Sequence, residues 1–325
     1  MSTGKINSVR SSLMRRMYSI VEMMSVLAVN IDDDEAKGLI EKFKKSTNVR
    51  LFDCITFFDG LDILELRLNI LDPYFDYFII VEASKTHAGE PKSLYFHDNR
   101  ERFKKFEDKI IYVLITDMPS ILQEGNSRAD LASFQRNQIK LGLVDCRDSD
   151  IIFISDFDEI PNPLKLPYAI KLLNLGISKV RFKQELYYYY LNGRMPLQPW
   201  LFGTVCTKYK TLREQFDLKP DMLRHSEISI NDIDCPLLKN GGWHFSYIGG
   251  LDAILRKISS FEMTSLDRPE NKDQEDILTK ISRGDDLFGR HGHKINYESL
   301  DEGSYPKYLL DNREKFRHLL KDTAS

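Results

Sequence analysis

The sequence lacks the usual marks of a zinc ribbon, a disulfide scaffold and a glycine-rich phosphate loop. Its four cysteines are far apart and form no Cys-x-x-Cys pair, so we expect buried free thiols. No Gly-x-Gly-x-x-Gly or Gly-x-x-x-x-Gly-Lys-Ser string occurs. A bound phosphate would therefore have to be held by side chains and a metal ion.

A basic excess is also missing. The 325 residues include 46 lysines and arginines against 49 acidic residues, for a formal net charge of −3. A nucleic-acid-binding surface would normally leave a positive balance, so we expect no nucleic-acid partner. The chain has no Asn-x-Ser/Thr acceptor. That absence favours a place outside the secretory pathway, and we expect a reducing, cytoplasmic setting.

Long hydrophobic runs are scarce as well. Residues 13–27 space their apolar side chains for one face of a helix, but Glu22 interrupts the stretch. It falls short of the ~20 apolar residues that a spanning helix needs, so we expect no transmembrane segment. A helix packed on the core is the favoured interpretation. Peripheral contact of residues 1–30 with a membrane surface is the alternative. A second short, exposed helix is expected at 35–45.

The remaining chain alternates apolar strands with helices. Strands are expected at 51–58, 77–81, 110–115 and 151–154, and helices at 61–71, 99–106, 130–144 and 164–175. This alternation indicates parallel strands joined by right-handed crossovers. We therefore predict an α/β fold with a doubly wound, mostly parallel central sheet, helices on both faces and a small antiparallel addition.

The pattern changes after residue 175. Residues 180–190 alternate apolar and polar side chains, which predicts one half-exposed strand with 201–210 as its partner. Its tyrosines and Trp200 would form an aromatic surface that suits sugar rings, although tyrosine is common in any strand. Further helices are expected at 249–261, 272–282 and 308–321.

The most informative stretch is 151–161, an apolar run that ends in acid. Four large apolar residues without polar alternation indicate a strand buried on both faces. In extended chain Asp156 and Asp158 project to the same side, at the edge where such sheets bind ligands. Two carboxylates suit Mg²⁺ or Mn²⁺, which keep positions open for phosphate oxygens. The alternative is an exposed turn, as for most Asp-x-Asp pairs.

A second distinctive string is 241–246, where two glycines precede Trp243 and His244. Glycine allows close backbone approach at this point. A nitrogen of His244 as a further ligand would favour Mn²⁺ over Mg²⁺. A hydrogen-bonded structural histidine and a core tryptophan are the more common roles for such residues.

Six sequence segments extend these observations over most of the chain: 57–68, 76–89, 134–137, 154–161, 242–246 and 306–310. They resemble glycosyltransferase family seventeen, the family of the β-1,4-mannosyl-glycoprotein 4-β-N-acetylglucosaminyltransferases. The resemblance implies a GT-A-type fold and an inverting transferase. Such an enzyme moves a sugar, most often N-acetylglucosamine from UDP-N-acetylglucosamine, to a hydroxyl of a glycan acceptor with a divalent metal, usually Mn²⁺.

The resemblance also implies a division of the chain. It comprises an N-terminal helical extension (1–48) and one glycosyltransferase domain (49–325), made of a nucleotide-sugar half (49–160), an acceptor half (161–265) and a C-terminal helical wrap (266–325). By position, Asp156 and Asp158 would be the metal-binding acids and His244 a further ligand.

The nucleotide-sugar pocket would be lined by Glu82, Lys85, Arg136, Asp156 and Trp243. For the first three, a strand-end carboxylate, a solvated loop lysine and a helix-surface ion pair are equally common roles.

Two carboxylates, Asp252 and Glu185, are candidates for the catalytic base, against the alternative that each is a surface carboxylate. The family pattern leads us to expect a His and a Glu close together after residue 261, but the chain reads Glu262-Met263-Thr264-Ser265. Two functions are therefore kept as alternatives: an inactive sugar-binding or scaffold protein of the same fold, and a metal-dependent phosphohydrolase that uses the same acids.

Overall fold

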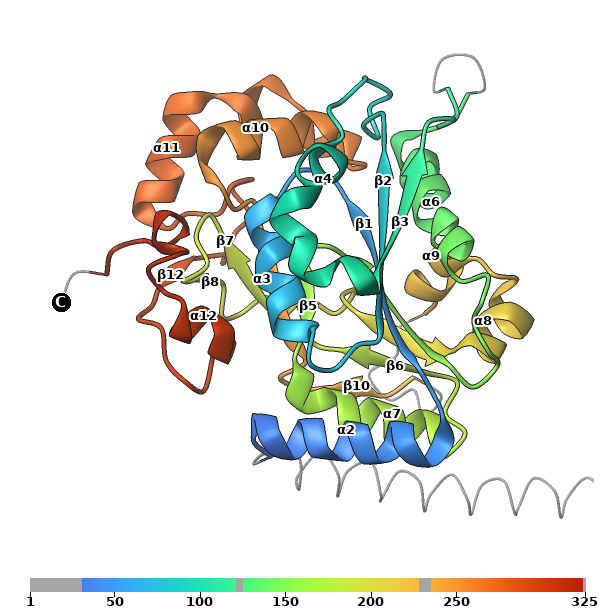
Figure 1. Ribbon diagram of the computed structural model, residues 1–325. Helices are drawn as coiled ribbons and strands as arrows, with labels where there is room; N and C mark the ends of the chain where they lie inside the picture. The colour runs from blue at the N-terminus through green and yellow to red at the C-terminus, as the bar shows by residue number, and fades with distance from the viewer. Residues whose placement is uncertain (1–30, 121–124, 228–234, 324–325) are drawn as a thin grey trace, which may run out of the picture.

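The computed structural model describes residues 31–120, 125–227 and 235–323. Its central feature is a seven-stranded sheet in the order β10-β6-β9-β4-β1-β2-β3 (Figure 1). The strands are β1 Leu51–Phe57, β2 Tyr77–Ala83, β3 Ile110–Ile115, β4 Ile151–Asp156, β6 Lys179–Phe182, β9 Val205–Lys208 and β10 Leu237–Leu238. β1 pairs in parallel with β2 and β4, and β2 with β3, whereas β9 runs antiparallel between β4 and β6. The predicted mixed α/β fold with a mostly parallel central sheet is confirmed.

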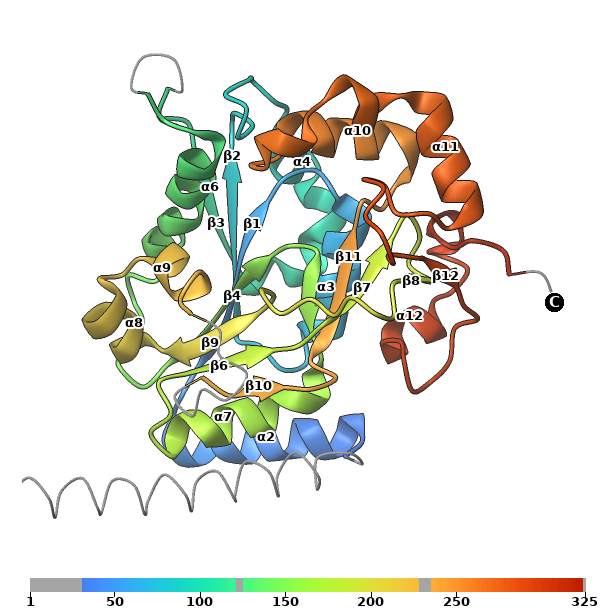
Figure 2. The same cartoon turned by 180° about the vertical axis from the view of Figure 1, so that it is seen from behind.

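Helices cover both faces of this sheet because its strands send alternate side chains to opposite sides. In β1, Leu51 and Ile55 enter one hydrophobic cluster, and Phe52 and Cys54 enter another. The first cluster is covered by α3 Leu61–Leu71, α4 Tyr95–Asp98, η2 Arg100–Lys109 and α7 Leu166–Asn174. The second is covered by α6 Arg128–Asn137, η3 Gln138–Gly142, α8 Tyr209–Phe216 and α9 Pro220–Arg224 (Figure 2).

A smaller five-stranded sheet lies beside the first, in the order β12-β8-β7-β11-β5. Its strands are β5 Glu159–Pro161, β7 Glu185–Tyr188, β8 Gly193–Arg194, β11 Gly242–Ser246 and β12 Asn296–Tyr297. β11 pairs in parallel with β7 and antiparallel with β5. This sheet supplies the wall that faces the acids after β4.

The prediction of one half-exposed strand over 180–190 is wrong. The segment divides into β6 and β7, which belong to different sheets and are almost wholly buried. The alternation was misleading because polar residues in the segment are also buried. Arg181, for example, donates hydrogen bonds to the carbonyls of Leu223, Arg224 and Ser226. The expected partner is confirmed, since β9 pairs with β6.

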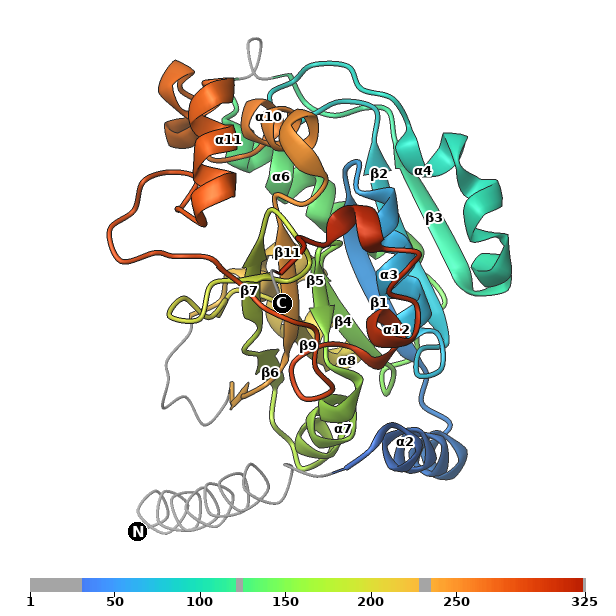
Figure 3. The same cartoon turned by 90° about the vertical axis from the view of Figure 1, so that its left-hand side faces the viewer.

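Helix α2, Asp33–Thr47, is longer and better packed than the exposed helix expected at 35–45. Ala36 and Ile40 are buried in the main core, and α2 lies against α7 (Figure 3). Lys44 fixes the helix to the next unit, with its ammonium 2.9 Å from a carboxylate oxygen of Asp76. The amphipathic stretch 13–27 lies outside the described residues.

The C-terminal part begins with α10 Gly250–Ser260 and continues through η5 Thr264–Leu266, η6 Pro269–Lys272 and α11 Gln274–Arg283. α10 and α11 lie side by side at one end of the molecule (Figure 1). The single helix expected at 308–321 is wrong: α12 spans Lys307–Asp311, and only a short turn, η7 Arg317–Leu319, follows. Among the described residues, no helix has the length and apolar character needed to cross a bilayer.

Candidate functional site

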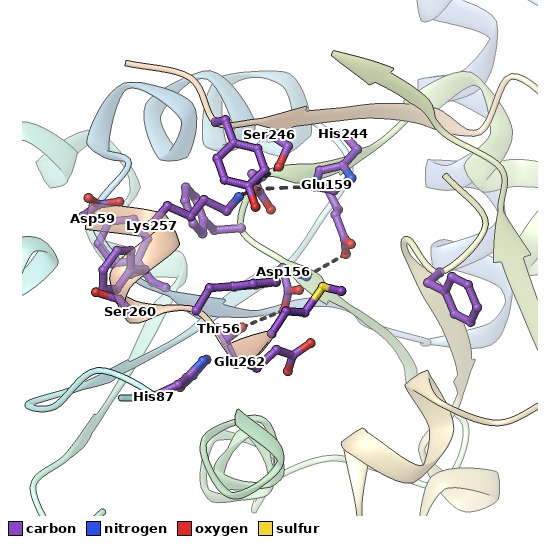
Figure 4. Close-up of a pocket in the computed structure, with 18 of the residues that line it drawn as sticks. Thr56, Asp59, His87, Asp156, Glu159, His244, Ser246, Lys257, Ser260 and Glu262 are labelled. Atoms are coloured by element: carbon purple, nitrogen blue, oxygen red, sulfur yellow. Dashed lines mark hydrogen bonds and ion pairs between the residues drawn. The ribbon is translucent and has the colours of Figure 1, made fainter. Parts of the chain in front are cut away.

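A pocket of about 470 Å³ opens where the parallel strands β1, β2 and β4 end (Figure 4). Thr56 and Asp156 come from the ends of β1 and β4, and Lys85 from the loop after β2. The facing wall includes His244 of β11, and Lys257 of α10 closes another side. The position agrees with the general rule that open α/β sheets bind ligands at the carboxyl ends of their strands.

Asp156 is held between two arginines. Its Oδ1 accepts hydrogen bonds from Thr56 Oγ1 at 2.9 Å and Arg136 Nη2 at 3.1 Å, and its Oδ2 accepts one from Arg224 Nη2 at 2.9 Å. Burial alone would raise the pKa of this carboxyl group, but the two guanidinium groups hold it well below its usual range. Asp156 is therefore ionised at neutral pH.

Asp158 faces a different cation. Its Oδ2 accepts a hydrogen bond from Lys257 Nζ at 2.7 Å, and His244 Nε2 lies 3.7 Å from the same oxygen. Lys257 also donates to Ser246 Oγ at 3.1 Å. Burial opposes ionisation, but Lys257 and His244 outweigh it and lower the pKa of Asp158. This carboxylate is charged as well.

Glu159 accepts hydrogen bonds from several groups on the side of the pocket nearest the second sheet. Arg224 donates to both of its oxygens at 2.7 Å, and Trp200 Nε1 donates to Oε1 at 2.6 Å. The backbone N–H of Asp156 donates to Oε2 at 2.9 Å. The Trp200 ring lies 4.8 Å from the ring of His244, measured between centroids. The buried Glu159 thus orients an arginine and an aromatic ring at the wall of the pocket.

The opposite end of the pocket carries neutral polar groups. His87 Nε2 lies 2.9 Å from Gln135 Oε1, and Gln135 Nε2 donates to the carbonyl of Val81 at 3.1 Å. Since the amide nitrogen is already a donor, Oε1 must accept from His87. Burial lowers the pKa of His87, so its imidazole is neutral at pH 7.

Of the five residues predicted to line a nucleotide-sugar pocket, three border the pocket described above: Lys85, Arg136 and Asp156. The other two face elsewhere. The buried Glu82 accepts from the backbone N–H of Phe96 and His97 and from the hydroxyl of Tyr112, and it does not border the pocket.

Trp243 points away from the pocket because side chains alternate along β11. Its Nε1 donates to the carbonyl of Ser304 at 2.7 Å. His244 and Ser246, one residue on either side of Phe245, line the pocket instead. The string thus lies beside the pocket, but His244 and Ser246 rather than Trp243 reach it.

The two candidates for the catalytic base also lie outside the pocket lining. Glu185 pairs with Arg194, whose Nη2 lies 2.9 Å from Oε2. Asp252 is exposed in the first turn of α10. The geometry brings neither to the acids of β4.

The pocket contains charged residues that sequence reasoning missed, namely Arg224, Lys257 and Glu262. They lie between 66 and 104 residues beyond Asp158 in the chain and belong to no local motif. Only the fold brings them to the site. Trp200 had a signal, since it belonged to the predicted aromatic surface.

The residues present fit a divalent cation that is shared with a ligand. Within the described ranges, no group of three or more His, Cys, Asp or Glu side chains could hold a metal by itself. Mg²⁺-type sites, however, often use one or two carboxylates and complete their shell with substrate phosphates and water. Asp158 and His244 match this mode: the 3.7 Å between Oδ2 and Nε2 is too long for a hydrogen bond, yet one ion can touch both atoms. His244 Nδ1 is buried and has no hydrogen-bond partner within the described residues.

Fold and pocket together define an α/β protein with a charged ligand pocket at the ends of its parallel strands. A profile of Glycosyltransferase family 17 matches residues 27–324. The chain belongs to this family, which confirms the resemblance seen in its sequence.

Three curated relatives carry the name β-1,4-mannosyl-glycoprotein 4-β-N-acetylglucosaminyltransferase. Those from Rattus norvegicus and Mus musculus are each 24% identical over 303 and 300 residues, covering 84% of this chain. The relative from Homo sapiens is 24% identical over 301 residues, covering 83%. The chain spans 55% of the length of each relative.

Two solved structures are weakly similar to the chain. A 4-diphosphocytidyl-2C-methyl-D-erythritol synthase from Anaerococcus prevotii is 12% identical with a TM-score of 0.37, covering 71% of this chain and 99% of that chain. A putative glucose-1-phosphate thymidylyltransferase from Bacillus anthracis is 12% identical with a TM-score of 0.33, covering 60% of this chain and 88% of that chain.

Proposed function

We propose that this chain is an inverting, metal-dependent glycosyltransferase with a GT-A-like fold. Its donor would be a UDP-sugar, UDP-N-acetylglucosamine first of all, and its acceptor a hydroxyl of a glycan. Membership of the family supports glycosyl transfer. The names of the relatives support N-acetylglucosamine as the transferred sugar and a glycoprotein glycan as the acceptor.

One observation carries the proposal. In the pocket, Asp158 Oδ2 and His244 Nε2 lie 3.7 Å apart, and Arg136, Arg224 and Lys257 also line it. A cation held by the first two and three fixed positive groups form the environment that an anionic diphosphate requires. A neutral or purely acidic pocket would not bind such a ligand.

The remaining walls suit the other parts of a nucleotide sugar. The neutral His87, whose Nε2 donates to Gln135, can accept a hydrogen bond from a base at Nδ1 without adding charge. On the other side, Trp200 and Phe202 form an edge-to-face pair with centroids 5.9 Å apart beside His244. Aromatic faces with a fixed orientation suit the apolar face of a sugar ring.

Mn²⁺ or Mg²⁺, when bound, would neutralise charge on the diphosphate as it leaves. Asp158 and His244 would hold the ion. Asp156 would keep Arg136 and Arg224 in place, and the positive charges of these two arginines would attract the phosphate oxygens. Attack of the acceptor hydroxyl from the face opposite the diphosphate gives inversion in one displacement.

An inactive sugar-binding protein of the same fold is the second candidate. It is favoured by one observation: both acids of the site are already paired with internal cations, Asp156 with two arginines and Asp158 with Lys257. Such a protein would bind a UDP-sugar without releasing UDP.

The experiment is a thermal-shift screen of UDP-sugars with and without Mn²⁺, followed by measurement of UDP release with a glycan acceptor. We expect one UDP-sugar to raise Tm only with metal, and the same donor to release UDP. Asp158→Asn should abolish the metal-dependent shift and lower the rate at least about 100-fold. Asp148→Asn is the matched control, because Asp148 forms a surface ion pair with Arg213. Binding without UDP release would favour the inactive protein, and no binding by any UDP-sugar would contradict both functions.

A further inference from the structure

The carboxylates that line the pocket differ in whether they are paired. Asp156, Asp158 and Glu159 are bound to basic side chains as described above, and Asp59 lies 3.1 Å from Arg256 Nε. Glu262 is the exception. Within the described residues, neither an ion pair nor a hydrogen bond engages its carboxylate. A carboxylate already held by a guanidinium or ammonium group is a poor proton acceptor, so pairing singles out Glu262.

Glu262 lies just after α10, on the side of the pocket where Asp156 is bound by its arginines (Figure 4). The groups that act on it come from three elements: Arg136 of α6, Asp156 at the end of β4, and Arg224 of α9 with the adjoining His225. Partial burial raises the pKa of Glu262 above its ordinary value, and the negative charge of Asp156 adds to this. Its carboxylate therefore binds a proton more readily than a solvated glutamate does.

The place of Glu262 relative to α10 is also fixed. Lys257, on the last turns of α10, is anchored to Asp158 and Ser246. At the end of the helix, the backbone N–H of Phe261 donates to the carbonyl of Lys257 at 2.9 Å. The helix whose Lys257 contacts Asp158 is thus followed, five residues after that lysine, by Glu262 at the pocket wall.

We propose that Glu262 is the general base of the transfer reaction, an inference that rests on the proposed function. The Glu262 carboxylate takes the proton of the acceptor hydroxyl as the hydroxyl oxygen forms a bond to the anomeric carbon. At the same time the bond from that carbon to the diphosphate oxygen breaks, and its electron pair leaves with UDP. The proton on Glu262 then passes to water, which restores the carboxylate. The substrate class at this subsite is therefore a neutral sugar hydroxyl rather than a charged nucleophile.

The test compares Glu262→Gln with Glu270→Gln, an exposed glutamate of η6. Glutamine keeps the size and hydrogen-bonding capacity of the side chain but cannot take the proton. For Glu262→Gln we expect kcat to fall by about 10²–10⁴-fold, with the KM for the donor and the Tm shift caused by UDP with Mn²⁺ close to the wild-type values. Glu270→Gln should match the wild type in all three.

Two outcomes would overturn the inference. Retention of kcat within about threefold in Glu262→Gln would show that another group takes the proton. Loss of the UDP-dependent Tm shift together with activity would show that Glu262 supports donor binding instead. A wild-type protein that binds a UDP-sugar but releases no UDP would contradict the proposed function itself, a result distinct from either of these.

Discussion

Arg67 and Asp53 form a bidentate ion pair in the protein core, with Arg67 Nε 2.7 Å from Oδ2 and Nη2 2.6 Å from Oδ1. Both side chains are at most 1% exposed. The remaining donors of Arg67 reach the acidic turn after β4, at 2.8 Å to the carbonyl of Glu159 and 3.2 Å to that of Asp156. A buried guanidinium with satisfied donors therefore fixes the backbone that carries the site.

Arg67→Lys should destabilise the fold although it keeps the charge. Lysine cannot reproduce the bidentate geometry, so Asp53 and two carbonyls lose their donors in the core. We expect a loss of about 3–5 kcal/mol in the free energy of unfolding, measured in urea. The control is Arg102→Lys, because the side chains of Arg102 and of its partner Asp62 are each 34% exposed. That change should cost no more than about 1 kcal/mol. Equal losses in the two variants would contradict the role given to Arg67.

The parallel half of the fold could be predicted from sequence because its signals are local. β3 and α3 have the expected bounds, and β1, β2 and β4 differ from expectation by at most two residues. Each of these strands is an apolar run ended by polar residues, so burial on both faces left a clear pattern. A small antiparallel addition was predicted, but the strands of the second sheet were not located in the sequence because they are short and pair across long sequence separations, as with β5 and β11.

Only the part of the site at the end of β4 could be predicted from the sequence. Asp156 ends an apolar strand and Asp158 lies in the turn that follows it, so the apolar run was enough to place both acids at a strand end, and both line the pocket. The cations that neutralise them, Arg224 and Lys257, come from helices remote in the chain. No periodicity in the sequence marks a helix surface that faces a pocket rather than water. The charge balance of the site is therefore a property of the tertiary structure.

Lys257→Met tests whether Lys257 occupies the position that the cation would take on Asp158. Burial alone would lower the pKa of Lys257, but Asp158 raises it overall, so the ammonium is charged. Removing the ammonium leaves the Asp158 carboxylate without its closest partner, although the Asp158 side chain is only 6% exposed. We expect the Tm of the metal-free protein to fall by at least about 3 °C.

Mn²⁺ should then stabilise this variant more than the wild type, because the ion no longer competes with an internal cation for Asp158. Tm is measured over a series of Mn²⁺ concentrations. Lys307→Met, which removes an exposed pair with Asp311, serves as the control and should show the wild-type metal response. A smaller Mn²⁺ response in Lys257→Met than in the wild type would contradict the shared position.

Asp286→Asn tests whether the Asp286 carboxylate makes a pH-dependent contribution to the free energy of unfolding. The Oδ2 of Asp286 accepts from the backbone N–H of Phe288 at 3.0 Å and of Arg290 at 2.9 Å, and Arg290 Nε lies 3.0 Å from it. Burial would raise the pKa of Asp286, but the hydrogen bonds from Arg290 outweigh it and lower the pKa overall. This contribution is therefore fully present above the unfolded pKa of about 3.9 and is lost as pH falls through the folded value.

Relative to wild type, Asp286→Asn should lose about 1–3 kcal/mol at pH 7 and pH 5, with a smaller difference at pH 3.5, measured by urea unfolding. Asp285→Asn is the adjacent control, since Asp285 pairs at the surface with Lys294. It should change stability by less than about 1 kcal/mol at each pH. A difference for Asp286→Asn that stays constant down to pH 3.5 would be inconsistent with the lowered pKa.

Gly242→Ala should disturb the strand that carries His244. Gly242 has a φ of +134°, and a Cβ atom there would lie 2.1 Å from the carbonyl oxygen of Ile160 and 2.7 Å from the backbone nitrogen of Asn162. Because these contacts are backbone atoms of β5 and its end, β11 must move away from β5. We expect a loss of more than about 2 kcal/mol and, at temperatures where the variant is folded, a weaker Mn²⁺-dependent response to UDP. Gly38→Ala in α2, where a Cβ meets nothing within 4 Å, should instead be neutral or stabilising by up to about 1 kcal/mol. An unchanged metal response in a destabilised Gly242→Ala would show that His244 contributes nothing to the cation site, and Asp158 would then remain its single protein ligand.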